Sequence, residues 1–269
     1  MHFKSSKTNI PGKSQGAHGV ARVISKRGFC SRSKAEALVR EGCVKLNGRL
    51  TRDPDAPARE TDEITVNGQR VETNPKVYFM MNKPRGVVTT ASDEKGRKTV
   101  MEVFAEQYGK MFPGKSVPHI APVGRLDAAS EGLLLFTNDT EWANSIMEPT
   151  RNRSAANKDS AGQKHLKIYR VQANGKPSED NLKKMEAGFT VPPRVFGEPD
   201  EFMHAVSAKI HSEGEKNCWL EIVLDEGKNR EIRRMLAHLG YEVLRLVRIQ
   251  IDEFKLGELK PGCIKQIER

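Results

Sequence analysis

A change of sequence pattern near residues 70–76 constrains the fold of this 269-residue chain most strongly. Before it, the run "GVARVISKRGFCSRSKAEALVREGCVKLNG" predicts two short helices and a strand. After it, strand-like runs beginning at "NPKVYFMMNKPRGVVTT" are separated by Pro and Gly, and helical stretches are predicted at about 98–108, 178–187 and 230–239. The chain therefore predicts an α+β protein with a small helix-hairpin domain ahead of a larger, strand-rich one.

Local signals place the elements of the small domain. Ser33 and Glu36 have the S-x-x-E spacing of a capping box, which predicts that the second helix begins there. Asn47-Gly48 is the dipeptide that best accepts positive φ in a tight hairpin turn, and a second strand is predicted at residues 62–68. The small domain should therefore end in a β-hairpin.

Positive charge is concentrated in this first part of the chain. The whole sequence has 45 Lys and Arg against 35 Asp and Glu, a formal charge of +10 and a pI near 9.4, which favours a nucleic-acid partner over the alternative of a solvated basic surface. Residues 1–18 are polar and predict a flexible basic tail. Arg27, Arg32 and Lys34 surround the loop between the two predicted helices, where they could hold phosphates or form a solvated helix face.

The segment "CSRSKAEALVREGCVKLNG" resembles the alpha-L RNA-binding module found in a ribosomal small-subunit protein and in several RNA-modifying enzymes. The resemblance covers residues 19 to about 70, and it implies that the basic loop faces RNA. We therefore expect a tail at 1–18, an RNA-binding domain at 19–72 and a catalytic domain at 76–269.

The stretch "GKMFPGKS" fits the phosphate-loop pattern G-x-x-x-x-G-K-[ST], beginning at Gly109. A working phosphate loop joins a buried strand to a following helix. Here the preceding residues have helical spacing, and Pro118 and Pro122 stand where the following helix should run. We therefore interpret the match as a loop after a helix and expect no nucleotide hydrolysis.

A better candidate site follows in "GRLDAASEGLLLFTND". Asp127 precedes small polar residues, a glycine and an apolar run, so it should sit on a loop that leads into a buried strand. Such a loop is a rigid platform for a functional carboxylate. Taken alone, an Asp two residues after Arg125 is more often part of a turn or of a structural ion pair.

This segment resembles the signature G-R-L-D-x-x-[TS]-x-G-L-L of pseudouridine synthases of the RsuA-like branch, which modifies ribosomal RNA. Three further segments resemble that branch's motifs in the same order: "MMNKPRGVVTT", "KIYRV" and "EGKNREIRRM". With the RNA-binding module, the resemblance spans residues 19 to about 260. It implies a mixed, mainly antiparallel catalytic domain that isomerises a specific uridine to pseudouridine.

The resemblance also implies the roles of individual residues. Asp127 would be the nucleophile, either attacking carbon 1′ of the ribose or taking part in an elimination to a glycal. Arg233 would be the cation that pairs with it, and Tyr169 the ring that stacks on the target base and helps to remove the proton from its carbon 5. Without the resemblance, Tyr169 would be read as a core tyrosine. Arg125 would enter the base stack that the flipped uridine vacates. Arg230 and Lys228 would contact phosphates or belong to a solvated cluster.

The remaining expectations concern partners and location. Four cysteines without a C-x-x-C pair, no membrane-length apolar run and no signal-type N-terminus predict a cytoplasmic protein. The reaction that the resemblance implies needs no cofactor or metal, and a monomer is the default expectation because the RNA can supply the partner surface. Ribosomal RNA or a pre-ribosomal particle is the expected partner, with large-subunit RNA favoured. The alternative is a non-catalytic RNA-binding assembly factor; a methyltransferase would need a glycine-rich loop that the sequence lacks. Residues 149–167 predict a long mobile loop.

Overall fold

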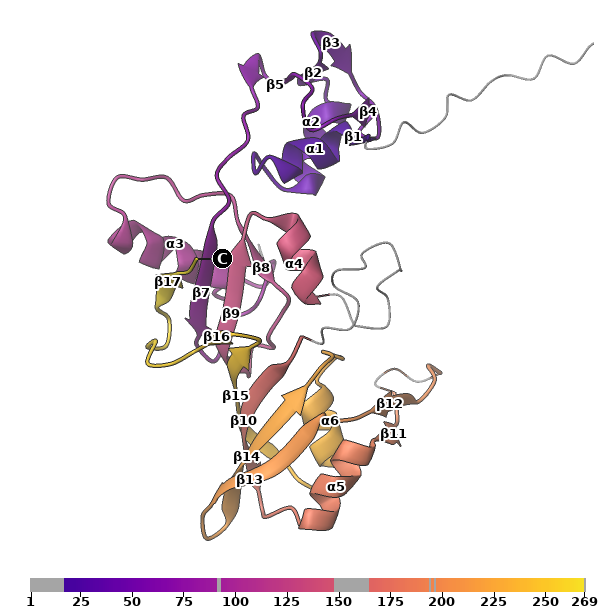
Figure 1. Cartoon of the computed structure of the whole chain (residues 1–269), viewed down its shortest axis with the longest axis vertical. Helices are drawn as coiled ribbons and strands as arrows, with labels where there is room; N and C mark the ends of the chain where they lie inside the picture. The colour runs from indigo at the N-terminus through magenta and orange to yellow at the C-terminus, as the bar shows by residue number, and fades with distance from the viewer. Residues whose placement is uncertain (1–16, 91–92, 148–164, 194, 196, 269) are drawn as a thin grey trace, which may run out of the picture. The chain divides into compact units, whose positions relative to one another are not determined.

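A computed structural model describes residues 17–90, 93–147, 165–193, 195 and 197–268 (Figure 1). Nearly all of the predicted basic tail and of the predicted long loop lie outside these described residues. The chain forms two compact units, one ending at Lys76 and the next beginning at Val77. Within the described residues, no helix combines the length and the apolar character needed to cross a membrane.

The first unit contains two helices and small antiparallel sheets around one apolar core. Its elements are α1 (Val20–Lys26), α2 (Arg32–Arg40), a sheet in the order β3 (Arg49–Thr51), β2 (Val44–Leu46), β5 (Ile64–Val66) and β6 (Gln69–Arg70), and the pair of β1 (His18–Gly19) with β4 (Pro57–Ala58). One face of each helix is buried with the inner side chains of β2 and β5, which makes the unit an independent helix-hairpin body.

Two local predictions in this unit have different outcomes. The turn prediction is confirmed, because Asn47 and Gly48 have φ of 49° and 78° between β2 and β3. The capping box at Ser33 is wrong. Ser31 caps α2 instead, since its hydroxyl accepts a hydrogen bond of 3.2 Å from the backbone N–H of Lys34. Glu36 pairs with Arg32 at 3.1 Å on the helix surface, so it is not free to close a capping box.

The second unit is built on one mixed, mainly antiparallel sheet. Its strand order is β13 (Ser207–Glu213), β14 (Asn217–Leu224), β10 (Lys167–Asn174), β15 (Val243–Ile251), β9 (Glu131–Thr137), β7 (Tyr78–Lys83) and β17 (Ile264–Gln266), with β8 (Ala121–Val123) on β9 and β16 (Phe254–Lys255) on β15. The helices are α3 (Val100–Met111), α4 (Thr140–Met147), α5 (Glu179–Ala187) and α6 (Glu231–His238), and β11 (Phe189–Val191) pairs with β12 (Glu201–Met203). The α+β class and the three predicted helices are confirmed.

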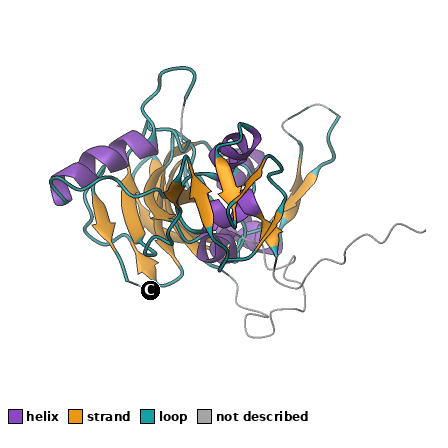
Figure 2. Ribbon diagram, turned by 90° about the horizontal axis from the view of Figure 1, so that it is seen from above, coloured by secondary structure: helices purple, strands orange, loops and turns teal. Residues whose placement is uncertain are grey.

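The two halves of this sheet are buried differently, which explains their sequence patterns. In β7 and β9, alternate residues pack on α3 and on α4, so both faces are covered and the runs "FMM" and "LLLF" are continuously apolar. In β10 and β14, buried and partly exposed residues alternate because α5 and α6 cover one face (Figures 1 and 2). The pattern of apolar residues in each strand therefore depends on whether helices cover one face of the sheet or both.

The two halves meet at a short parallel pairing between β9 and β15. Gly132 lies opposite Arg248 there, with φ of 104°. A Cβ on Gly132 would lie 2.2 Å from the carbonyl oxygen of Arg248, well inside contact distance. Only glycine can occupy this position without moving the backbone of β15.

The sequence "GKMFPGKS" has the wrong surroundings for a phosphate loop. Residues 109–111 of the match are the end of α3, and residues 112–116 lie in the helix-free segment 112–120 that follows. The order is helix then loop, the reverse of what phosphate binding at a helix N-terminus requires. This agrees with the interpretation from the sequence.

Candidate active site

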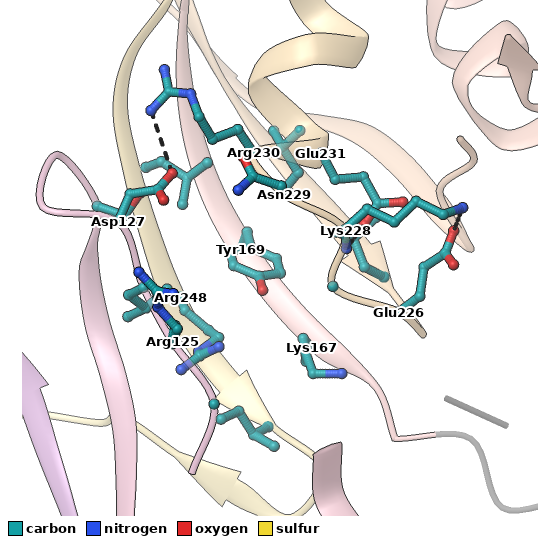
Figure 3. Close-up of a pocket in the computed structure, with 18 of the residues that line it drawn as sticks. Arg125, Asp127, Lys167, Tyr169, Glu226, Lys228, Asn229, Arg230, Glu231 and Arg248 are labelled. Atoms are coloured by element: carbon teal, nitrogen blue, oxygen red, sulfur yellow. Dashed lines mark hydrogen bonds and ion pairs between the residues drawn. The ribbon is translucent and has the colours of Figure 1, made fainter. Parts of the chain in front are cut away.

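A cavity of about 680 Å³ lies beside the joint between the two halves of the sheet (Figure 3). Its walls come from the β8–β9 loop, from β10 and β15, and from the turn that leads into α6. The charged residues that line it are Arg125, Asp127, Lys167, Asp225, Glu226, Lys228, Arg230, Glu231, Arg233 and Arg248. Six cations and four acids among these side chains give the cavity a cationic character that suits a polyanionic substrate.

Asp127 lies on the β8–β9 loop, and the segment after β7 holds this loop in place. The hydroxyl of Thr89 donates to the carbonyl oxygen of Leu126 at 2.7 Å and accepts from its N–H at 3.3 Å. The N–H of Gly86 donates to the carbonyl oxygen of Ala128 at 2.7 Å. Residues far apart in sequence therefore fix the backbone on both sides of Asp127, while its side chain remains 40% exposed at the cavity mouth.

Lys83 supports the same loop from inside the protein. Its ammonium is fully buried and donates to the carbonyl oxygens of Pro84, Asp127 and Ser130 at 3.1, 3.1 and 2.8 Å. Burial lowers the pKa of Lys83 to about 8, although the nearby Asp127 carboxylate acts in the opposite direction. At neutral pH the ammonium therefore stays charged in most molecules and anchors the loop.

The cation that pairs with Asp127 is Arg230. Its Nη1 lies 3.4 Å from Oδ2 of Asp127, and both side chains are about 40% exposed (Figure 3). Arg230 is the N-cap of α6 and adopts a left-handed backbone with φ of 53°, which turns its side chain back toward the β8–β9 loop. The family resemblance implied that Arg233 would form this pair, and in the structure the ion pair belongs to Arg230 instead.

Arg233 binds the backbone of the β8–β9 loop that carries Asp127. Its guanidinium donates to the carbonyl oxygens of Ala129 and Val243, each at 3.1 Å. Burial lowers the pKa of Arg233, Arg230 lowers it further, and Asp127 acts in the opposite direction. Arg233 therefore joins the Asp127 loop to β15 through backbone contacts.

Tyr169 and Lys167 stand two residues apart on β10, so both point to the cavity face of the strand (Figure 3). Tyr169 is 7% exposed and lies opposite Arg248 of β15 in the strand register. Burial lowers the pKa of Lys167, and Arg248 lowers it further. The cavity thus has an aromatic side chain on its floor with cations beside it.

Arg125 and Lys228, the two other expected substrate contacts, differ in how accessible their charged groups are to a substrate. Arg125 is exposed at the edge of the cavity. Lys228 is already engaged, because its ammonium donates at 2.6 Å both to the carbonyl oxygen of Phe202 and to Oε1 of Glu226. Lys228 therefore fixes the turn before α6 more than it presents a free charge.

In the first unit, the structure separates the three predicted phosphate contacts. Arg27 is only 8% exposed, and its guanidinium donates to the carbonyl oxygens of residues 60, 62 and 71. Burial lowers the pKa of Arg27, with Arg70 as the next cause. This placement argues against phosphate binding by Arg27 and gives it a structural role. Arg32 and Lys34 are exposed, as a phosphate contact requires.

Several residues of the site were not singled out from the sequence, among them Lys83, Arg248 and Glu231. Lys83 could have been recognised from the sequence, because a lysine at the end of the buried run "YFMMN" needs hydrogen-bond acceptors inside the protein. Arg248 is a similar case, because it is a cation in the largely apolar strand β15. It is 4% exposed and donates to the carbonyl oxygen of Leu133 at 2.8 Å. Glu231 is 3% exposed at the start of α6, and nothing in the sequence distinguishes it from an ordinary first-turn acid.

All four cysteines are free thiols. Among the residues that the structure describes, no three His, Cys, Asp or Glu side chains gather closely enough to hold a metal ion.

Comparison with known proteins identifies both units. The model of a family described as RNA pseudouridylate synthase matches residues 77–238, and that of the S4 domain matches residues 20–64. The chain is 35% identical to the ribosomal large subunit pseudouridine synthase B of Bacillus subtilis over 91% of this chain and 90% of that protein. It is 34% identical to an uncharacterized RNA pseudouridine synthase of Aquifex aeolicus over 93% and 90% of the two chains. A crystal structure of a pseudouridylate synthase superposes with a TM-score of 0.57 at 26% identity, covering 93% of this chain and 96% of that one.

Proposed function

Because this chain belongs to the RNA pseudouridylate synthase family, we propose that it converts one uridine of ribosomal RNA into pseudouridine at the cavity beside Asp127. The predicted enzyme class, an RNA pseudouridine synthase, is thereby confirmed. The S4 match at residues 20–64 supports RNA binding by the first unit. We propose the division of labour expected from the sequence, with RNA binding by residues 19–72 and catalysis by residues 76–269.

The observation that carries the assignment of Asp127 is its rigidly held loop at the mouth of a cationic cavity. The reaction breaks the bond between nitrogen 1 of uracil and carbon 1′ of ribose, turns the base, and joins carbon 5 to carbon 1′. Carbon 5 loses a proton and nitrogen 1 gains one, so no atom is added or removed and no cofactor is required. In this proposal the Asp127 carboxylate is the nucleophile, and the fixed loop keeps it aligned with the ribose.

The cations around Asp127 take two roles in this proposal. Arg230, at 3.4 Å, offsets the charge of the carboxylate and can release it to the substrate, because both side chains are partly exposed. Arg233 acts as a positioning residue through the carbonyl oxygen of Ala129, at 3.1 Å. This assignment replaces the expected pairing of Arg233 with the nucleophile.

Tyr169 and Arg125 would handle the base. The Tyr169 ring on the cavity floor can stack on uracil, and its hydroxyl can help to remove the proton from carbon 5. A uridine in structured RNA must leave its base stack first, which costs roughly a few kcal/mol. Arg125 is exposed at the cavity edge, where its planar guanidinium can occupy the vacated position.

Large-subunit ribosomal RNA, free or in a pre-ribosomal particle, is the substrate that we propose. The name of the Bacillus subtilis relative supports this choice. Four free thiols suit the reducing cytoplasm, where we place the protein, and we propose a monomer because the RNA can supply the partner surface. A non-catalytic RNA-binding assembly factor is the alternative that the experiment must exclude.

The test is tritium release from ribosomal RNA labelled at carbon 5 of uridine, on naked RNA and on under-modified large-subunit particles. Wild type should release tritium, and the nearly isosteric Asp127→Asn variant should release none while its RNA affinity stays within a few fold. Release by the Asn variant would contradict the assignment of Asp127. Binding without release by wild type on either substrate would favour the assembly factor.

A further inference from the structure

Glu231 closes the turn that carries Arg230. Its Oε2 accepts a hydrogen bond of 3.0 Å from the N–H of Lys228, and its own N–H donates to the Lys228 carbonyl oxygen at 3.2 Å. Arg230, between them in sequence, has the left-handed backbone that aims its guanidinium at Asp127. The geometry of this short turn therefore determines where Arg230 points.

The environment of Glu231 disfavours a charge on its carboxyl group. The side chain is 3% exposed, and within the described part of the chain its Oε1 is buried without a hydrogen-bond partner. The charged groups around it are Glu226 and Lys228 of the same turn and Lys167 of β10, with His204 and Asp225 beyond them. The Lys228 ammonium is bound to Glu226 at 2.6 Å, and Lys228 lowers the pKa of Glu231 through its charge and its backbone N–H, although less than burial and Glu226 raise it.

Burial raises the pKa of Glu231 to about 8, and the neighbouring Glu226 carboxylate acts in the same direction. At neutral pH most molecules therefore carry an uncharged acid at this position. When Glu231 ionises, its negative charge adds to that of the neighbouring Glu226 carboxylate, and the repulsion weakens the closed turn.

We propose that Glu231 is a positioning residue that works in its protonated form: the neutral carboxyl group holds the 226–230 turn so that Arg230 stays on Asp127. This inference rests on the proposed function, because the position of Arg230 matters for catalysis only if Asp127 is the reacting group. It gives the enzyme a built-in loss of activity at alkaline pH.

The first test compares kcat of wild type, Glu231→Gln and Glu231→Ala between pH 6 and 9 with saturating RNA. Glutamine reproduces the neutral acid's shape and its acceptor oxygen, so Glu231→Gln should keep kcat at pH 7 within about threefold. Glu231→Ala leaves the Lys228 N–H unpaired and should lose about tenfold or more in kcat with little change in KM.

The decisive quantity is the ratio of wild-type to Glu231→Gln kcat, because other titrating groups are common to both proteins and cancel. Above pH 8 the protonated fraction of Glu231 falls about tenfold per pH unit, so the ratio should fall with it. A constant ratio across the range, or a Gln variant as impaired as the Ala variant, would overturn the proposal.

A second measurement does not depend on catalysis, so it separates this proposal from the proposed function. Both tryptophans, Trp142 and Trp219, belong to the second unit, and their fluorescence reports its unfolding in urea. Between pH 4.5 and 8 the folded wild type holds a proton on Glu231 that the unfolded chain has lost, so its stability should fall as pH rises.

Relative to Glu231→Gln, the unfolding equilibrium constant of wild type should therefore increase up to about tenfold per pH unit in this window. Equal pH dependence in both proteins would show that Glu231 is ionised in the folded state and would sink the proposal. The expected pH dependence in a protein that makes no pseudouridine would uphold the protonated state of Glu231 and reject the proposed function.

Discussion

The buried ammonium of Lys83 donates a hydrogen bond of 3.1 Å to the backbone carbonyl oxygen of Asp127, so the residue that ends β7 holds the residue that we assign as nucleophile. Two further carbonyl oxygens, those of Pro84 and Ser130, bind the same ammonium. The strand and the loop are 44 residues apart in sequence and act as one structural element.

Replacing Lys83 by Met should therefore impair catalysis through the loop. Methionine fills a similar volume but removes the ammonium from three carbonyl oxygens, of which that of Asp127 still accepts from the N–H of Ser130. The lost hydrogen bonds should cost about 1–3 kcal/mol of stability. A displacement of the Asp127 carboxylate by about 1 Å lowers kcat on the order of 10²-fold. Tritium release and urea unfolding would measure both effects, with Lys110→Met on the exposed surface of α3 as the matched control. A Lys83→Met variant with wild-type kcat would show that the loop holds its shape without the ammonium.

Arg230 and Arg233 should give different results when each is replaced by Gln. Arg230 is partly exposed and pairs with Asp127 at 3.4 Å, so its loss should lower kcat while stability changes by less than about 1 kcal/mol. Arg233 binds two backbone carbonyl oxygens and is more buried than Arg230. Its loss should therefore lower kcat by about 10²-fold and the free energy of unfolding by about 1–3 kcal/mol. Tryptophan-monitored unfolding and tritium release on the same samples separate the two. Equal stability losses would contradict the assigned contacts.

Substitutions of Arg27 and of Arg32 should also have different effects, although both are basic residues near the same loop. Arg27→Met removes the donor for three carbonyl oxygens and should destabilise the first unit by about 1–3 kcal/mol, which limited proteolysis of the intact chain would detect. Arg32→Gln should leave proteolysis unchanged, weaken RNA binding a few fold and reduce the salt dependence of binding by about one phosphate contact. If Arg27→Met weakened RNA binding while the first unit stayed intact, Arg27 would be a phosphate contact after all.

The sequence predicts those features of the structure that are determined by residues close together in the chain. The apolar run of β9, the helix stripe of α6 and the Asn47-Gly48 turn are set by neighbours in the chain, and the structure contains them as expected. Arg27 differs, because its carbonyl partners lie 33 to 44 residues away and no local pattern marks them. It therefore looked like a surface cation.

The pairing of Asp127 was missed for a related reason. Arg230 and Arg233 lie three residues apart, and helical spacing alone would place them on one face. Arg230 precedes the helix and adopts a left-handed backbone, so its side chain leaves in another direction. The backbone conformation of a residue at a helix N-cap depends on the hydrogen bonds of its turn, here those between Glu231 and Lys228, and residue types alone do not display it.

Gly132→Ala should disrupt the second unit at the joint between the two halves of its sheet. Its φ of 104° is strained for alanine, and the added Cβ would meet both the carbonyl oxygen and the nitrogen of Arg248, at 2.2 and 2.7 Å. Backbone atoms cannot rotate away as a side chain can, so β15 must move from β9, and a loss of about 4 kcal/mol or more is expected.

Gly109→Ala is the matched control for this change. Gly109 lies in α3, and nothing stands within 4 Å of an added Cβ, so alanine should raise stability by up to about 1 kcal/mol. Urea unfolding followed by tryptophan fluorescence would compare the two variants with wild type. Because the first unit has its own core, Gly132→Ala should retain an RNA-binding fragment that resists proteolysis while pseudouridine formation is lost. Wild-type stability in Gly132→Ala would mean that the two halves of the sheet are not joined as closely as Gly132 and Arg248 indicate.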